Sequence, residues 1–107
     1  MTPRKVAYSK TFIEQLLDFT ERGEREYGER LAQEKKKRVF NVLDTTIATT
    51  PAIKPRHAKL GLVVYPVTKT PFLVIYDYDN LEVRVVACLL TGAGDRLEDF
   101  DPNAVEW

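Results

Sequence analysis

The sequence has little of what disulfide or metal chemistry requires. It contains one cysteine, Cys88, and one histidine, His57, among 107 residues. A single cysteine cannot form an internal disulfide, and because Cys88 stands in an apolar run, we interpret it as a small core residue. Structural zinc sites use about four cysteine and histidine ligands. The composition therefore excludes a disulfide framework and predicts a protein without a metal site or cofactor.

Long apolar runs are also missing. No stretch approaches the roughly 18 consecutive apolar residues that cross a bilayer, and residues 1–10 lack the apolar centre of a signal peptide. We expect a cytoplasmic protein without a membrane partner. With 44% hydrophobic residues, a chain of this length builds one core. The prediction is a single domain over residues 1–107, with residues 91–107 as a C-terminal tail that is rich in glycine and acidic residues.

Charges are unevenly distributed along the chain although the formal net charge is zero. Residues 1–60 hold 13 lysines and arginines against 8 acidic residues, whereas residues 61–107 hold 3 against 8. The two parts therefore carry opposite net charges. Such asymmetry fits either one basic and one acidic face, or charges that mix once the chain folds. A mixed surface is the simpler interpretation.

The first half of the chain has the pattern of a short strand followed by two helices. Residues 4–8 alternate weakly and lead to Ser9, whose hydroxyl can cap a helix. From Thr11 onward, apolar residues recur at helical spacing until Gly23 interrupts them. A second helical stripe runs over residues 31–47. The two helices are expected to pair as an antiparallel hairpin.

The second half has the pattern of three strands. Residues 60–67, 72–78 and 82–90 are rich in valine, leucine, isoleucine and tyrosine, which favour strands. Their connectors are too short for the crossover of about a dozen residues that parallel strands need, so an antiparallel meander is predicted. The apolar start of the middle run predicts burial on both faces, and Pro66 is expected at a strand edge or end.

The fold class is therefore α+β: an N-terminal strand, an antiparallel helical hairpin and a three-stranded antiparallel meander, in the order β-α-α-β-β-β. Several phrases in this order resemble the RelE/ParE toxin superfamily. They are Val6-Ala7-Tyr8-Ser9 before Phe12, and the runs at residues 61–67, 71–78 and 83–87. The resemblance extends over nearly the whole chain, although no phrase alone is diagnostic. Any small domain with this order of elements would show similar alternation.

The resemblance implies the toxin of a bacterial type II toxin–antitoxin system, held in a hetero-oligomer with a cognate antitoxin. Family members of the RelE type cleave mRNA on the ribosome, whereas those of the ParE type inhibit DNA gyrase by binding. RelE-like nucleases resemble one another in placing an arginine before the phrase that Val63-Val64-Tyr65 matches, and this chain has Leu62 there. RNA cleavage needs cations that stabilise the phosphorane, which leucine does not supply.

We therefore favour the ParE-like interpretation, a gyrase inhibitor without catalytic residues of its own. A ribosome-dependent mRNA interferase and a non-toxic binding partner or co-repressor stay open as alternatives. A nuclease would draw on a base, an acid and several cations, and His57 is the one side chain that titrates unperturbed near neutrality. The candidate catalytic residues are Arg56, His57, Lys59 and Arg96, although solvated surface charge explains the same cations equally well.

The ParE-like interpretation points to binding surfaces instead. The resemblance implies that the sheet end and the C-terminal segment contact the target, here through Arg84, Arg96 and Trp107. Because an indole left in water wastes apolar surface, Trp107 is expected to fold back onto the sheet or to contact a partner. Family antitoxins place apolar side chains in a groove between hairpin and sheet. The candidate antitoxin contacts are Phe19, Tyr27 and Phe40.

The run Lys35-Lys36-Lys37-Arg38 could bind nucleic acid, since clustered cations release counterions from phosphates. Four successive helical residues, however, point around most of the helix circumference. Glu34 and Arg38 also have the spacing of a stabilising i, i+4 pair. A solvated helix face is the simpler interpretation of this run.

Overall fold

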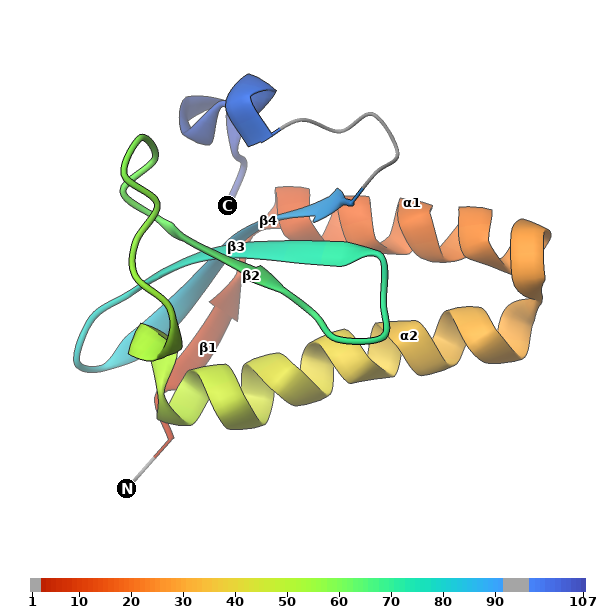
Figure 1. Ribbon diagram of the computed structural model, residues 1–107, viewed down its shortest axis with the longest axis horizontal. Helices are drawn as coiled ribbons and strands as arrows, with labels where there is room; N and C mark the ends of the chain where they lie inside the picture. The colour runs from red at the N-terminus through yellow and green to blue at the C-terminus, as the bar shows by residue number, and fades with distance from the viewer. Residues whose placement is uncertain (1–2, 92–96) are drawn as a thin grey trace.

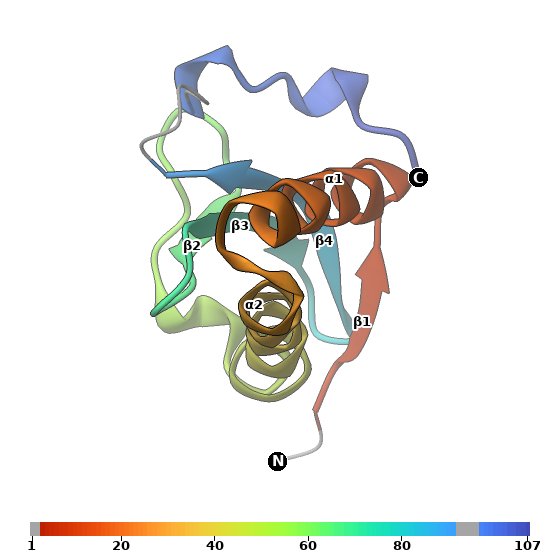
Figure 2. The same cartoon turned by 90° about the vertical axis from the view of Figure 1, so that its right-hand side faces the viewer.

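Two helices pack on one face of a four-stranded sheet in the computed structural model, which describes residues 3–91 and 97–107 (Figure 1 and Figure 2). This arrangement confirms the predicted α+β class and the order β-α-α-β-β-β. A π-helical turn (Leu43–Ile47) and a short 3-10 turn (Pro51–Ile53) follow α2, and two short 3-10 turns (Leu97–Asp99 and Pro102–Ala104) follow β4. The elements are β1 (Lys5–Tyr8), α1 (Lys10–Tyr27), α2 (Glu29–Val42), β2 (Val63–Pro66), β3 (Phe72–Tyr78) and β4 (Glu82–Leu90).

The sheet has the strand order β1-β4-β3-β2. β2 pairs with β3 and β3 with β4 in antiparallel fashion, which confirms the predicted meander. β1 joins the far side of β4 as a parallel strand, with Val6 opposite Val83. The edge strand β2 ends at Pro66, so the proline that cannot donate to the ladder stands at an edge and an end, as predicted.

The helices begin and end partly where the sequence predicts. Ser9 caps α1, since its hydroxyl oxygen accepts the backbone N–H of Phe12 at 2.8 Å. Gly23 does not interrupt α1, which continues to Tyr27; this part of the helix prediction was wrong. One glycine costs a helix only about 1 kcal/mol, and the buried side of α1 offsets that cost. The chain reverses at Gly28, whose φ of 96° favours glycine.

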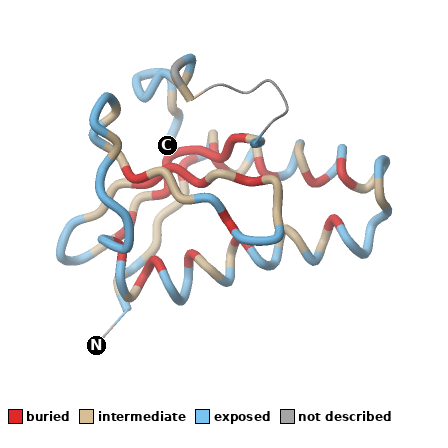
Figure 3. Tube along the Cα trace, viewed as in Figure 1, coloured by how far each residue is buried: buried red, intermediate tan, exposed pale blue. Residues whose placement is uncertain are grey.

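The sheet has an apolar layer on each face, and Figure 3 shows the buried residues concentrated along its strands. The helix-facing layer includes Phe12, Val39 and Tyr76, all fully buried. On the opposite face, buried β3 and β4 residues are covered by partly buried apolar side chains. β3 is therefore covered on both faces, as predicted. Val64 and Leu73 belong to the sheet itself, whereas the partly buried side chains packed on it from outside the strands are Leu62, Leu97, Phe100 and Val105.

β2 is shorter than the predicted strand at residues 60–67. Residues 57–61 instead form a turn, in which the N–H of Gly61 donates to the carbonyl of His57 at 2.8 Å. Gly61 adopts a φ of 69°, which is not an extended conformation, so β2 begins only after it, at Val63. Within the described residues, no helix is both long and apolar enough to cross a membrane.

Candidate functional site

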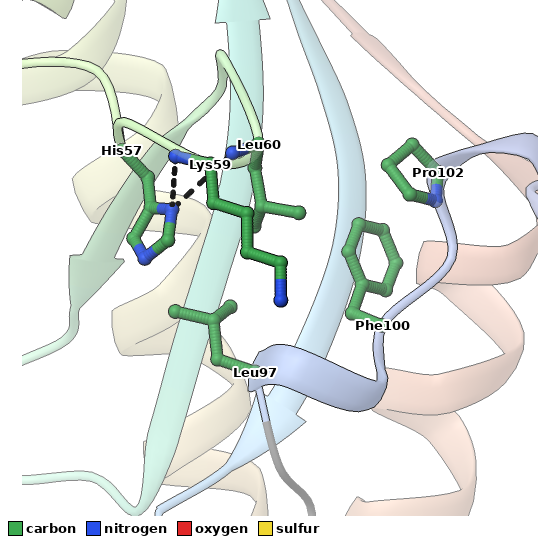
Figure 4. Close-up of a pocket in the computed structure, with 6 residues that line it drawn as sticks. All are labelled: His57, Lys59, Leu60, Leu97, Phe100 and Pro102. Atoms are coloured by element: carbon green, nitrogen blue, oxygen red, sulfur yellow. Dashed lines mark hydrogen bonds between the residues drawn. The ribbon is translucent and has the colours of Figure 1, made fainter.

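A pocket of about 440 Å³ lies between the 57–60 turn and the C-terminal segment (Figure 4). Two of the predicted nuclease candidates, His57 and Lys59, line it together with apolar side chains. The structure thus brings these two candidates together on the sheet face opposite the helices. The apolar lining consists of Leu60, Leu97, Phe100 and Pro102.

His57 has a structural role in this pocket. Its Nδ1 accepts the backbone N–H groups of Lys59 at 3.2 Å and of Leu60 at 3.3 Å (Figure 4). A neutral imidazole has one acceptor nitrogen, and here that nitrogen holds the turn. Protonation at Nδ1 would break both hydrogen bonds, so His57 is poorly arranged to act as a general base.

Arg56, the next candidate, does not line this pocket, and its guanidinium contacts the end of β3. Its guanidinium forms an ion pair with Asp77 and stacks 4.5 Å from the centre of the Tyr78 ring. It also donates to the carbonyls of Gly61 and Tyr78, each at 3.1 Å. These contacts fasten the 56–61 loop to the sheet, so Arg56 is a structural clamp.

Arg84 lies beside Arg56 in the same network of charges. Its guanidinium contacts Asp79 at 3.0 Å, Glu82 at 3.1 Å and Asp77 at 3.6 Å. We call the five side chains Arg56, Arg84, Asp77, Asp79 and Glu82 the sheet-end network. It contains three carboxylates and two guanidinium groups.

Two carboxylates of the sheet-end network, those of Asp77 and Asp79, stay ionised at neutral pH. Backbone N–H groups of Glu82 and Leu81, together with Arg84, lower the pKa of Asp79 to about 2. Burial tends to raise the pKa of Asp77, but hydrogen bonds and the charges of Arg56 and Arg84 outweigh it and lower that pKa. With one carboxylate in excess, the network repels a phosphate and does not supply the cations that RNA cleavage needs.

The acidic members of this network, Asp77, Asp79 and Glu82, were not predicted from the sequence. Asp77 lies directly opposite Arg84 in the register of β3 and β4. Opposite charges facing each other across two strands stabilise a hairpin. The carboxylates and the arginine that flank the turn between β3 and β4 could therefore have indicated this network. Their pairing can be predicted only once the register of the two strands is known.

Leu62 stands where RelE-like nucleases resemble one another in having an arginine. Its side chain is partly buried and packs against the apolar layer that contains Ile75 and Ala87. The residue thus contributes to the core of the second sheet face. An arginine at this position would place a charge against apolar atoms.

The three aromatic residues predicted to contact an antitoxin lie in two different parts of the structure. Phe19 and Tyr27 line a groove of about 220 Å³ between α1 and the ends of β3 and β4, and the Phe19 ring stacks on Phe72 with centroids 6.2 Å apart. Phe40 lies elsewhere, packed edge-on against Tyr8 with centroids 5.5 Å apart. The groove lies between hairpin and sheet and includes two of the three aromatic residues predicted to contact an antitoxin.

The remaining target candidates lie in the C-terminal segment. Arg96 is outside the described residues. Trp107 follows a backbone that is tied to α1, since the N–H of Glu106 donates to Thr11 Oγ1 at 2.8 Å. The main chain therefore returns to the body of the protein, while the Trp107 side chain stays 60% exposed. In the described parts of the chain, no group of three His, Cys, Asp or Glu side chains could hold a metal ion.

Comparisons with known proteins inform the fold. No family model matches the sequence, and no curated protein sequence matches it. Among solved structures, the chain is similar to one from a chromosomal ParDE TA system of P. aeruginosa, with a TM-score of 0.71. The match covers 82% of this chain and 96% of that chain at 9% sequence identity. At this identity, the likeness shows a shared fold.

Proposed function

We propose that this protein is the toxin of a toxin–antitoxin pair and that it acts by binding its target, without cutting RNA. The fold shared with a chain of a ParDE TA system supports the functional class. The observation that carries the choice of mechanism is the sheet-end network, in which Arg56 and Arg84 are neutralised by carboxylates. A nuclease would need such cations free to stabilise the phosphorane.

DNA gyrase is the target that we propose within this class, with a cognate antitoxin as the second partner in the bacterial cytoplasm. The exposed indole of Trp107 supports a contact surface at the C-terminal segment, to which we also assign Arg84 and Arg96. The groove that contains Phe19 and Tyr27 suits apolar side chains of an antitoxin. We treat residues 1–107 as one toxin domain.

An mRNA interferase is the second candidate, and one observation favours it. His57 and Lys59 share a pocket with Phe100, whose ring could stack with a base. This function predicts codon-aligned cuts in mRNA when the protein is expressed. Substituting Lys59→Ala should then abolish the cuts while the protein stays folded.

Induced expression in a bacterial host, combined with purified protein, tests these alternatives. The proposed function predicts growth arrest, DNA-damage signalling and inhibited supercoiling by purified gyrase, while bulk mRNA stays intact. Co-expression of the short reading frame beside the gene should restore growth. Normal gyrase activity at an excess of the protein would overturn the gyrase assignment. Harmless overexpression would instead support a non-toxic partner or co-repressor.

A further inference from the structure

A cationic surface lies on α2, apart from the pocket and the sheet-end network. Three cations, Lys35 and Arg38 of α2 and Lys69 of the β2–β3 turn, line a pocket of about 330 Å³. Leu31 and Glu34 complete its lining. Figure 1 shows the turn between β2 and β3 reaching down beside α2. We call these five residues the α2 cationic surface.

The cations of this surface have no carboxylate partners within the described residues. Glu34, which has the spacing to pair with Arg38, instead lies 3.3 Å from Arg30. Four arginines elsewhere in the described residues, Arg22, Arg30, Arg56 and Arg84, do form ion pairs with carboxylates. The predicted Glu34–Arg38 pair is thus not formed, and this part of the helix-face interpretation was wrong. Among the described residues, Lys35, Arg38 and Lys69 therefore have no carboxylate within ion-pair distance, although Glu34 lines the same pocket.

The Lys35 side chain is held in place. Its ammonium lies 5.6 Å from the centre of the Tyr27 ring and 3.3 Å from the carbonyl oxygen of Lys69, to which it donates. The Lys69 backbone is fixed in the turn, since the N–H of Thr70 donates to the carbonyl of Val67 at 3.2 Å. The Lys35 ammonium and the Lys69 main chain are therefore in place beside one pocket before any ligand binds, which lowers the entropy cost of binding.

The other residues of the surface indicate the chemistry of its ligand. Leu31 is 46% exposed among the cations and offers an apolar contact. A phosphate backbone would gain nothing from an apolar contact with Leu31, whereas an apolar side chain of a peptide can cover it. Tyr27 also lines the apolar groove with Phe19, so that the cationic surface and the groove adjoin. These features favour a ligand that combines carboxylates with apolar side chains.

We infer that the α2 cationic surface binds an acidic, amphipathic segment of a partner protein. Carboxylates of that segment would pair with Lys35, Arg38 and Lys69, and an apolar side chain would cover Leu31. That the partner is the antitoxin rests on the proposed function. The surface itself follows from the charges and contacts on α2.

A fluorescent helical peptide with glutamate and leucine on one face is the probe that tests this inference. A triple variant, Lys35→Gln, Arg38→Gln and Lys69→Asn, removes the three charges; asparagine suits the φ of 64° at position 69. We expect this variant to bind the peptide about tenfold more weakly, given the usual strength of three exposed ion pairs. The control, Lys5→Gln, Arg25→Gln and Lys54→Gln, removes the same charge from exposed positions elsewhere and should bind like the unmodified protein.

The inference would be overturned if both triple variants bound the peptide equally well, or if the protein bound a peptide with glutamine in place of glutamate as well as the original peptide. It would also be overturned if the protein preferred a DNA duplex to the peptide, with strong salt dependence. Circular dichroism checks that the variants fold. If the triple variant unfolds, Leu31→Ala replaces it, because this exposed residue should weaken binding without loss of structure. Binding without any effect on growth would contradict the proposed function alone, whereas toxicity without peptide binding would contradict the surface alone.

Discussion

Asp79 holds the turn between β3 and β4 through one carboxylate. Its Oδ1 accepts the backbone N–H groups of Leu81 at 2.8 Å and Glu82 at 2.9 Å, and its Oδ2 lies 3.0 Å from Arg84 Nη1. The same carboxylate therefore stabilises the turn and pairs with Arg84, which is a candidate for contact with the target. A partner that recruits Arg84 must compete with Asp79, Asp77 and Glu82 for its guanidinium.

Replacing Asp79 with asparagine should flatten the pH dependence of stability in acid. The folded-state pKa of Asp79 is about 2, below the value of about 3.9 in an unfolded chain. Its stabilising contribution is therefore complete above the unfolded pKa and is lost as pH falls through the folded pKa. Urea unfolding of both proteins between neutral pH and that range measures the effect. The same steep acid loss in both would contradict the prediction; Asp18→Asn, on α1, controls for the removed charge.

Ser9 connects two elements through one hydroxyl group. Its oxygen accepts the N–H of Phe12 at the start of α1, and its O–H donates to the carbonyl of Val86 in β4. Val86 is the extra residue of a bulge, because Ile75 pairs with Ala87 and Tyr76 with Val85. The first helix is thereby anchored to the irregular point of the central strand.

The Ser9→Ala variant should lose about 1–3 kcal/mol of unfolding free energy, because it removes the helix cap and leaves a carbonyl without its donor in a buried place. Denaturant unfolding measures this loss. Thr45→Ala is the matched control, since Thr45 lies in the π-helical turn that continues α2 and its exposed hydroxyl donates to the carbonyl of Asn41; this variant should change stability by less than about 0.5 kcal/mol. Similar losses in both variants would show that the Ser9 contacts contribute little.

Gly23 and Tyr27 should be energetically coupled in α1. A Cβ at position 23 would collide with the hydroxyl end of the Tyr27 ring, so the glycine makes room for that ring beside the groove. In a Tyr27→Ala background, Gly23→Ala should stabilise the protein by about 0.5–1 kcal/mol through helix propensity. In the unmodified protein the gain should be smaller. A double-mutant cycle measures the difference, and additivity would contradict the coupling.

At the scale of the whole molecule, the helices pack on one apolar layer of the sheet and residues of the C-terminal segment pack on the other. Leu97, Phe100 and Val105 of that segment pack on the second apolar layer. The segment therefore contributes to stability as well as carrying the exposed Trp107. Its two roles can be separated by substitution.

Phe100→Ala should cost about 2 kcal/mol of unfolding free energy, less than for a fully buried phenylalanine, because the ring is partly buried. Trp107→Ala should cost less than about 0.5 kcal/mol, as expected for an exposed residue. Thermal and denaturant unfolding of both variants test this. If Trp107→Ala were the more destabilising of the two, the indole would have a packing role and not the proposed binding role.

The uneven charge distribution along the chain allowed either mixed charges or separate charged faces, and the folded protein has both. Arg56 from the basic first part pairs with Asp77 from the acidic second part, so charges mix at the end of the sheet. Lys35 and Arg38 remain unpaired with carboxylates among the described residues. A neutral chain thus keeps a local cationic surface, which steers acidic partners more strongly at low salt.

The sequence by itself determined the order of elements and the antiparallel meander. Helical spacing, strand composition and connector length are local properties, and the elements predicted from them largely agree with those in the structure. The same holds for the capping role of Ser9 and the edge position of Pro66. The end of α1 at Gly23 was predicted wrongly, because a local preference of about 1 kcal/mol yields to tertiary packing.

Only the tertiary structure decided which candidate residues share a site. It placed Phe40 against Tyr8, away from Phe19 and Tyr27, and it paired Arg84 with three carboxylates near the same turn. It also joined β1 to β4 in parallel, although residues 5 and 82 are far apart in the chain. Ion pairing and burial depend on distances between residues that sequence spacing does not encode, and packing of the two apolar layers sets those distances.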